Sequence, residues 1–196
     1  KSTATLLLKI EKDLAHWLPQ LKWLNLGGGH LMTKEGYETE VLITALKGFR
    51  ERHPHLSVTL EPGSAHAWQS GVLVAHVLDI VKSHGRVTAM LDVSFTCHMP
   101  DTLEMPYLPA LRGATTVSAE AIGENVYHLG GVSCLAGDTV GAYQFDKPLV
   151  VGQQLVLEDM LHYTTVKTTT FNGVQHPDLA IKRADGTIEI SRRFSF

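Results

Sequence analysis

Cys134 is the side chain whose neighbours best suit it to chemistry. It lies between Gly130-Gly131 and Gly137-Asp138, so it belongs to a loop framed by glycines. A thiol in such a loop can act as a general acid and deliver a proton to a carbanion. The alternative is that Cys134 is one of the buried, inert cysteines that are common in protein cores.

A carboxylate follows the strand expected at residues 56–60. Glu61 ends this strand and precedes Pro62-Gly63, a turn that aims the carboxylate toward the mouth of a barrel. In that position a carboxylate can hold the protonated ring nitrogen of pyridoxal phosphate and so make the ring an electron sink. The alternative is that Glu61 caps the next helix, where its charge meets the positive end of the helix dipole.

Two further features suit a phosphate group. Gly27-Gly28-Gly29 follows the strand expected at residues 21–26, and three glycines expose backbone N–H groups to a close approach, although they also make a tight turn. The sequence lacks the Lys-Ser or Lys-Thr of a P-loop and the third spaced glycine of a dinucleotide site. Tyr163, ahead of the Asn172-Gly173 turn, can donate its hydroxyl to a phosphate oxygen or can simply pack in a β-rich segment.

Cys97-His98 has the residue types of a metal site. Adjacent residues point in different directions, however, and no second pair follows at ligand spacing. We therefore predict that the chain binds no metal there.

The elements that position these residues are of two kinds. Residues 1–84 alternate between helical spacing, at 6–17, 35–50 and 65–82, and strand patterns, at 21–26 and 56–60. This repetition predicts an α/β domain. A closed (β/α)8 barrel takes about 250 residues, so we expect residues 1–84 to be only part of one.

The second part of the chain has β-branched runs separated by Gly, Pro and Asn, which predicts an all-β domain over residues 85–196. Asp185-Gly186 predicts a hairpin turn between residues 179–182 and 187–190. The main expected strands are residues 87–94, 115–121, 125–129, 154–158, 162–170 and 187–194.

Composition excludes several classes of protein. The 17 basic and 20 acidic residues give a net charge of −3 without a long run of either sign, so we expect no nucleic-acid or membrane partner. The apolar stretch at residues 71–78 is far shorter than the roughly 20 residues of a membrane span. The two cysteines form no disulfide framework, and no secretory leader is visible, so we expect a soluble, cytoplasmic protein.

Five segments resemble one known family by their order along the chain. From about residue 24 onward the chain resembles the carboxynorspermidine (carboxyspermidine) decarboxylases. The segments are Leu-Gly-Gly-Gly-His, Leu-Glu-Pro-Gly, Cys-His-Met-Pro-Asp-Thr-Leu-Glu-Met-Pro-Tyr, Gly-Gly-Val-Ser-Cys-Leu-Ala-Gly-Asp and Thr-Thr-Phe-Asn-Gly. The resemblance implies the alanine-racemase-like fold of type III, in which a (β/α)8 barrel is followed by a β-barrel or sandwich domain. It also implies pyridoxal 5'-phosphate as cofactor and the last step of spermidine-type polyamine biosynthesis.

The resemblance also assigns cofactor contacts. Gly28, Gly29 and Gly63 would bind the phosphate through backbone N–H groups, and Tyr163 would add a hydroxyl hydrogen bond. Glu61 would hold the pyridinium nitrogen.

On the substrate side, the resemblance makes Cys134 the proton donor. Related decarboxylases carry an acidic residue directly after that cysteine, where this chain has Leu135. We therefore expect Asp138, Asp101 and Glu104 to be the candidates for binding the distal amines of the polyamine substrate.

The resemblance further implies partners. The family's Schiff-base lysine lies on the first barrel strand, and Lys22, Lys34 and Lys47 are in the wrong register to replace it. The chain alone should therefore be inactive without an N-terminal half, and the cysteine loop should complete the neighbouring active site in a homodimer.

Two other functions remain open at this point. A non-catalytic homologue could bind and regulate a partner subunit, because an incomplete barrel exposes apolar surface and strand edges. A racemase or another amino-acid decarboxylase of the same fold would act on a smaller substrate. A racemase would need a second base, for which Tyr163 is the candidate, but its Phe-Asn-Gly context favours the phosphate role.

Overall fold

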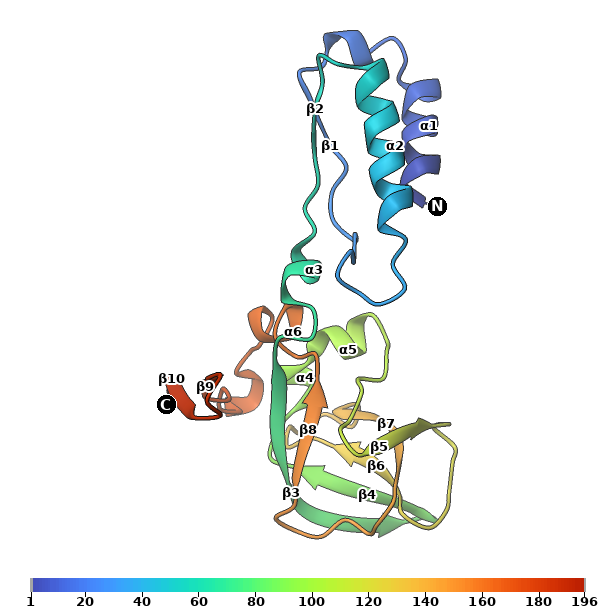
Figure 1. Ribbon diagram of the computed structural model, residues 1–196. Coiled ribbons are helices and arrows are strands. Elements are labelled where there is room, and N and C mark those ends of the chain that lie inside the picture. The colour runs from blue at the N-terminus through green and yellow to red at the C-terminus, as the bar shows by residue number, and fades with distance from the viewer. Residues whose placement is uncertain (1, 196) are drawn as a thin grey trace. The chain divides into compact units, whose positions relative to one another are not determined.

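The computed structural model describes residues 2–195, which form two compact units that divide between Trp68 and Gln69 (Figure 1). We call residues 2–68 the N-terminal unit and residues 69–195 the C-terminal unit. The division comes before the boundary that we predicted at residue 84. The reason is strand β3 (Val72–Ser83), which pairs with β4 along one edge and β8 along the other and so belongs to the second unit.

The N-terminal unit contains a helix followed by a β-α-β unit. Strands β1 and β2 are parallel, with Trp23 opposite Ser57 and Asn25 opposite Thr59, so both strands end side by side. The elements are α1 (Ser2–Asp13), the 3-10 turn η1 (Leu18–Gln20), β1 (Trp23–Asn25), α2 (Thr39–Arg52), β2 (Ser57–Thr59) and α3 (Gly63–Ala67).

The core of this unit lies between its helices and the strand pair. In α2 the apolar residues Leu42, Leu46 and Phe49 recur at helical spacing, and Phe49 is completely buried. Phe49 shares one cluster with Leu7 of α1 and with Leu18 and Leu56, while Leu24 and Val58 of the strands pack against it. The amphipathic helices thus bury the strand pair on one side.

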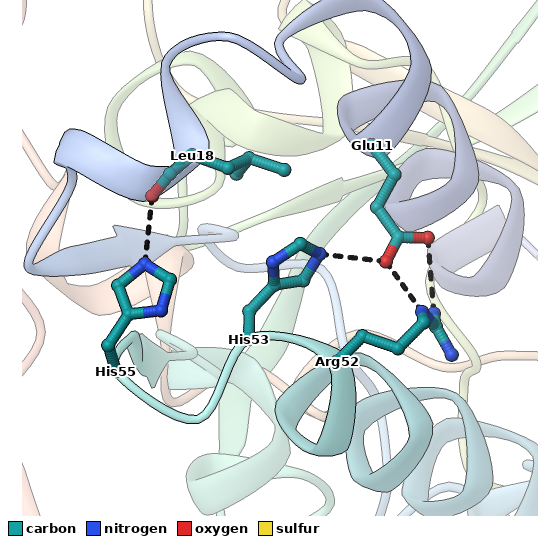
Figure 2. Close-up of polar contacts among 5 residues, drawn as sticks. All are labelled: Glu11, Leu18, Arg52, His53 and His55. Carbon is teal, nitrogen blue, oxygen red and sulfur yellow. Dashed lines mark hydrogen bonds and ion pairs between the residues drawn. The ribbon is translucent and has the colours of Figure 1, made fainter.

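A polar network joins the two long helices of this unit near their C-terminal ends (Figure 2). The Glu11 carboxylate accepts from Arg52 Nε at 2.7 Å and Nη2 at 3.1 Å, and it lies 2.9 Å from His53 Nε2. The hydrogen bond from Arg52 lowers the pKa of Glu11 below its ordinary value. His55 Nε2 lies 3.0 Å from the carbonyl oxygen of Leu18, which attaches the loop before β2 to η1.

The C-terminal unit is built on a six-stranded sheet with the order β5-β7-β6-β4-β3-β8. Neighbouring strands are antiparallel except β4 and β6. The other strands are β4 (Arg86–Leu91), β5 (Ala114–Val117), β6 (Val126–Gly130), β7 (Thr139–Phe145) and β8 (Gln154–Glu158).

This sheet curls until its two edges meet. Leu111, just before β5, forms an isolated antiparallel bridge with Leu157 of β8, and the N–H of Arg112 donates to the carbonyl of Val156 at 2.9 Å. The enclosed core includes Val77, Leu91, Leu129, Tyr143 and Leu157, each at most 1% exposed. The β-domain predicted from the sequence is therefore a curled, nearly closed barrel.

Short helices and a hairpin accompany the barrel. The helices are α4 (Phe95–His98), α5 (Pro100–Glu104) and α6 (Tyr163–Val166), followed by the 3-10 turn η2 (Phe171–Gly173). The predicted hairpin is confirmed as β9 (Leu179–Lys182) and β10 (Ile188–Arg192), with Gly186 at φ 87°. Within residues 2–195 no helix has the length and apolar character needed to cross a membrane.

Two predicted elements are wrong. Residues 65–82, predicted as one helix, contain the short α3 and the strand β3, in which Ala75 and Val77 are buried while His76 and Leu78 are exposed. This period of two, with several valines, outweighs the helical spacing. Residues 162–170, predicted as a strand, begin with α6. Strand β7 was missed, because Gly137 and Gly141 interrupt its pattern.

Candidate active site

In the N-terminal unit, the predicted carboxylate and glycines lie where the two parallel strands end. The backbone continues the pairing beyond β1 and β2, since the N–H of Glu61 donates to the carbonyl of Gly27 at 2.8 Å. Asn25, the last residue of β1, donates from Nδ2 to Glu61 Oε1 at 2.6 Å, and its Oδ1 accepts the N–H of Gly27 at 2.8 Å. Asn25 thus orients the Glu61 carboxylate, which is itself exposed.

Sequence reasoning missed Asn25. Its signal was its position, because a polar side chain that ends a strand directly before a glycine-rich loop points into the same space as that loop.

Gly28 and Gly29 of this loop differ in the space around them: Gly28 lies close to the backbone of Glu61, and Gly29 has open space beside it. A Cβ on Gly28 would lie 2.8 Å from the carbonyl oxygen of Glu61, so a side chain there requires the backbone to move. A Cβ on Gly29 would meet nothing within 4 Å. Within the described residues, the N–H groups of Gly28 and Gly29 have no hydrogen-bond acceptor, and both residues are exposed. Free, exposed N–H groups beside a strand end fit the needs of a phosphate group.

Gly63 is placed differently from Gly28 and Gly29. Its N–H donates to the carbonyl of Glu61 at 2.8 Å, so it closes the turn after β2.

His30, directly after the three glycines, is only 8% exposed, and its Nε2 has no hydrogen-bond partner among residues 2–195.

In the C-terminal unit, the loop that carries Cys134 connects β6 to β7. Cys134 is exposed with a free thiol, whereas Cys97 is buried. The exposure of Cys134 is what a proton donor to a bound substrate requires.

Asp138 fixes this loop from inside. It is 2% exposed, and its carboxylate accepts the N–H of Thr96 on Oδ1 and the N–H of Ser133 on Oδ2, both at 2.9 Å. Burial opposes its ionisation, yet these hydrogen bonds outweigh burial and lower the pKa of Asp138. Both oxygens thus accept hydrogen bonds from within the protein, and the binding of substrate amines by Asp138 stays a prediction.

Asp101 lies on α5 and faces α6. It is 9% exposed, and its Oδ2 accepts from the hydroxyls of Tyr107 at 2.9 Å and Thr164 at 3.3 Å. Burial, and then the hydrogen bond with Asp101, raise the pKa of Tyr107 far above its ordinary value. The other oxygen, Oδ1, is buried and has no partner among residues 2–195. A buried carboxylate oxygen without a donor is costly, so this atom suits a cationic ligand.

Glu104 and Tyr163 complete the α5–α6 region. Glu104 forms an ion pair with Lys167, directly after α6. Tyr163 is the first residue of α6 and is 58% exposed, with its ring nearly perpendicular to that of His162. The structure therefore brings Asp101, Glu104 and the Tyr163 segment to one region of the C-terminal unit.

Cys97 and His98 have a structural role in α4. His98 is 3% exposed, with Nδ1 accepting the N–H of Ser94 at 3.2 Å and Nε2 lying 3.0 Å from the carbonyl of Gln175. Burial lowers the pKa of His98. The Cys97 thiol donates to the carbonyl of Phe171 at 3.5 Å. Helix α4 is thus bonded to the 171–175 segment on one side and, through Thr96, to the Cys134 loop on the other.

The chain is similar to known proteins in sequence and in fold. Residues 17–160 match the family described as pyridoxal-dependent decarboxylase, C-terminal sheet domain. The chain is 54% identical over 188 residues to the carboxyaminopropylagmatine decarboxylase of Synechocystis sp., covering 96% of this chain and 48% of that protein. It is 42% identical over 198 residues to the carboxynorspermidine/carboxyspermidine decarboxylase of Campylobacter jejuni, covering 96% and 51%.

A solved structure is similar over nearly the whole chain. The crystal structure of carboxynorspermidine decarboxylase from Campylobacter jejuni, complexed with norspermidine, matches with a TM-score of 0.87 at 42% identity. The match covers 98% of this chain and 55% of that one. The chain thus spans about half the length of the curated relatives that it matches.

Proposed function

We propose that this chain, which belongs to the pyridoxal-dependent decarboxylase family, is the C-terminal half of an enzyme that decarboxylates a carboxylated polyamine. The observation that carries the proposal is the exposed Cys134 in a loop pinned by Asp138, in a chain 42% identical to a carboxynorspermidine/carboxyspermidine decarboxylase. Carboxynorspermidine and carboxyspermidine are the first candidate substrates, with norspermidine and spermidine as products.

Pyridoxal phosphate supplies an electron sink for the carbanion left when CO2 departs. The residues of the N-terminal unit fit two of its groups. The N–H groups of Gly28 and Gly29 would hold the phosphate, and the Glu61 carboxylate, which Asn25 orients through Oε1, would hold the protonated ring nitrogen. In the C-terminal unit, the exposed Tyr163 hydroxyl would be available as a donor to a phosphate oxygen.

Cys134 acts as the proton donor. Its thiol gives a proton to the substrate carbon from which CO2 has left, and solvent then restores the thiol. The Cys134 thiol is suited to this step because it is exposed at the loop surface, while Asp138 holds the loop backbone in place.

Asp101 and Glu104 bind the distal cations of the substrate. Asp101 Oδ1 offers a buried, unpaired acceptor, and Glu104 exchanges Lys167 for a substrate ammonium. This assignment provides the negative charge that Leu135 does not supply next to Cys134.

The remaining parts of the proposal concern the whole protein. The Schiff-base lysine belongs to the N-terminal half, the enzyme is a homodimer that shares active sites through the cysteine loop, and it works in the cytoplasm. Both cysteines are free, which suits a reducing compartment.

A second candidate substrate is carboxyaminopropylagmatine, because the Synechocystis relative named for it is 54% identical. Its distal cation is a planar guanidinium, which prefers a bidentate carboxylate, rather than an ammonium. The two candidates therefore make different demands on Asp101 and Glu104.

The test is CO2 release by the full-length enzyme with added pyridoxal phosphate, measured on carboxynorspermidine, carboxyspermidine and carboxyaminopropylagmatine. We expect kcat/KM for one of the three to exceed that for lysine, ornithine or diaminopimelate by at least about 100-fold, since a shorter substrate leaves the buried Asp101 Oδ1 without a cation. Equal or faster turnover of one of these simple amino acids would refute the proposal.

A further inference from the structure

The Cys134 loop folds back on itself around one buried carboxylate. The N–H of Gly131 donates to the backbone carbonyl of Asp138 at 2.7 Å, and the N–H of Asp138 donates to that of Leu135 at 2.9 Å. Inside this ring, Asp138 Oδ2 accepts the N–H of Ser133, the residue directly before Cys134. The backbone position of Cys134 therefore depends on the Asp138 side chain.

The second carboxylate oxygen attaches the loop to the rest of the barrel. Asp138 Oδ1 accepts the N–H of Thr96 in the first turn of α4, where a negative charge is favourable. Nearby, the N–H of Val132 donates to the carbonyl of Val93 at 3.1 Å. The loop is thus held by one side chain and one backbone hydrogen bond to the segment that begins α4.

Gly131 leaves room for this arrangement. A Cβ at Gly131 would lie 2.4 Å from Asp138 Oδ2, a distance that the buried carboxylate cannot tolerate without moving. Asp138 forms no ion pair with a basic side chain in the part of the chain that the structure describes, so its charge is stabilised by hydrogen bonds from the N–H groups of Thr96 and Ser133 and from the side chains of Ser133 and Ser94. Gly131 and Asp138 therefore form one unit.

We propose that Asp138, with Gly131, is the positioning residue that holds the Cys134 thiol where it can give up its proton. This inference rests on the proposed function, in which Cys134 is the proton donor. Asp138 itself does not touch the substrate. Its removal leaves the partly buried N–H groups of Ser133 and Thr96 without this acceptor, and the loop then relaxes toward water.

The kinetic test uses the full-length enzyme with Asp138→Asn. We expect kcat to fall between about tenfold and 100-fold with KM unchanged within about twofold, because a displacement of about 1 Å is enough to disturb the proton transfer. The matched control is Asp146→Asn, which alters an exposed carboxylate and should retain the parent kcat.

Two measurements distinguish positioning from a general structural role. In a Cys134→Ser background, Asp138→Asn should lower kcat by less than about twofold, because the group that it positions is already gone. Hydrogen exchange followed by mass spectrometry should accelerate at least about tenfold in peptides covering residues 93–99 and 131–138, and stay unchanged in residues 179–192.

If Asp138→Asn does not fold, Gly131→Ala provides the same test, since its Cβ displaces the carboxylate while the charge is retained. Unchanged kcat or unchanged exchange in the variant that folds overturns the inference. If exchange accelerates but Cys134→Ser leaves turnover unaltered, then Cys134 is not the proton donor. In that case the inference about positioning a donor fails together with that part of the proposed function.

Discussion

At the scale of single residues, the two cysteines differ in exposure, and this difference decides which of them can take part in a reaction. Cys134 is exposed, and Cys97 is buried with its thiol bonded to a backbone carbonyl. The glycine framing of Cys134 predicted its exposure correctly, because a loop with glycines on both sides has few side chains that could cover a thiol. Of the two thiols, only that of Cys134 is exposed enough to reach a substrate.

Cys134→Ala in the full-length enzyme should lower product formation at least about 100-fold, because general acid catalysis contributes at least that much. Pyridoxal phosphate should still bind, since no cofactor contact is removed. CO2 release, the yield of decarboxylated amine and cofactor absorbance measure the three effects. Val132→Ala, an exposed change in the same loop, should behave as the parent enzyme. Parent-like turnover of Cys134→Ala would remove the thiol from the mechanism.

Other residue roles were beyond sequence reasoning. Asp138 and Asp101 are both acidic residues near expected turns, and nothing in their local pattern says how many of their oxygens are satisfied. That depends on contacts with Thr96 and Thr164, which are 42 and 63 positions away in the sequence. Whether a carboxylate fixes a loop or awaits a cation is therefore a property of the tertiary structure.

At the scale of elements, helix α4 connects the segments that carry the candidate residues. Its backbone and side chains bond to the Cys134 loop through Thr96 and to the 171–175 segment through Cys97 and His98. The adjacent Cys97-His98 pair, considered for metal binding from the sequence, forms these connections instead. Helix α4, which has four residues, is thus bonded to both the Cys134 loop and the 171–175 segment.

The burial of His98 makes the C-terminal unit sensitive to acid. Its lowered pKa means that the unfolded chain takes up this proton before the folded protein does. The contribution of His98 to stability is therefore complete above its ordinary pKa of about 6.5 and is lost as pH falls from there toward the lowered value. Between pH 7.5 and 5.5 we expect Tm to fall.

The measurement is thermal unfolding at a series of pH values. The fall in Tm should be smaller in His98→Gln than in the parent, while His66→Gln, an exposed control, should match the parent. Burial lowers the pKa of His128 as well, so the His98 variant should keep part of the slope. An identical slope in His98→Gln and the parent would contradict this account.

The elements themselves were predicted unevenly, for physical reasons. Helix α2 and strands β1 and β2 were found because their apolar residues recur with one clear period. Strand β3 was assigned to a helix because Leu73, Val77 and Ile80 also fit a spacing of three and four residues. What decided its conformation was pairing with β4 and β8, contacts that no local pattern reveals.

At the scale of the whole molecule, the chain provides a barrel domain that is nearly closed on itself and an α/β unit that is not. The C-terminal unit joins its edges through Leu111 and Leu157. The N-terminal unit has one pair of parallel strands, and Leu8 and Trp23 are each 64% exposed on it. Residues 1–84 are too few for a closed (β/α)8 barrel, and two parallel strands are only a small part of one.

The chain alone should therefore release no CO2 from any carboxylated polyamine. Activity should return when it is co-expressed with the N-terminal half of the same protein, to which we assign the Schiff-base lysine. The assay is CO2 release by the purified chain, by the other half and by the co-purified pair. A variant of the pair that lacks that lysine is the control and should be inactive. Turnover by the chain alone would show that a lysine within it suffices.

The way Asp138 is held has a consequence for how this protein can vary. An ordinary ion pair is lost when either of its side chains mutates, but two of the donors to Asp138 are the backbone N–H groups of residues 96 and 133, which every amino acid except proline contributes. Position 96 can therefore change to any residue but proline and keep this hydrogen bond, whereas position 133 also contributes its serine side chain to the carboxylate, so a change there removes part of the anchor.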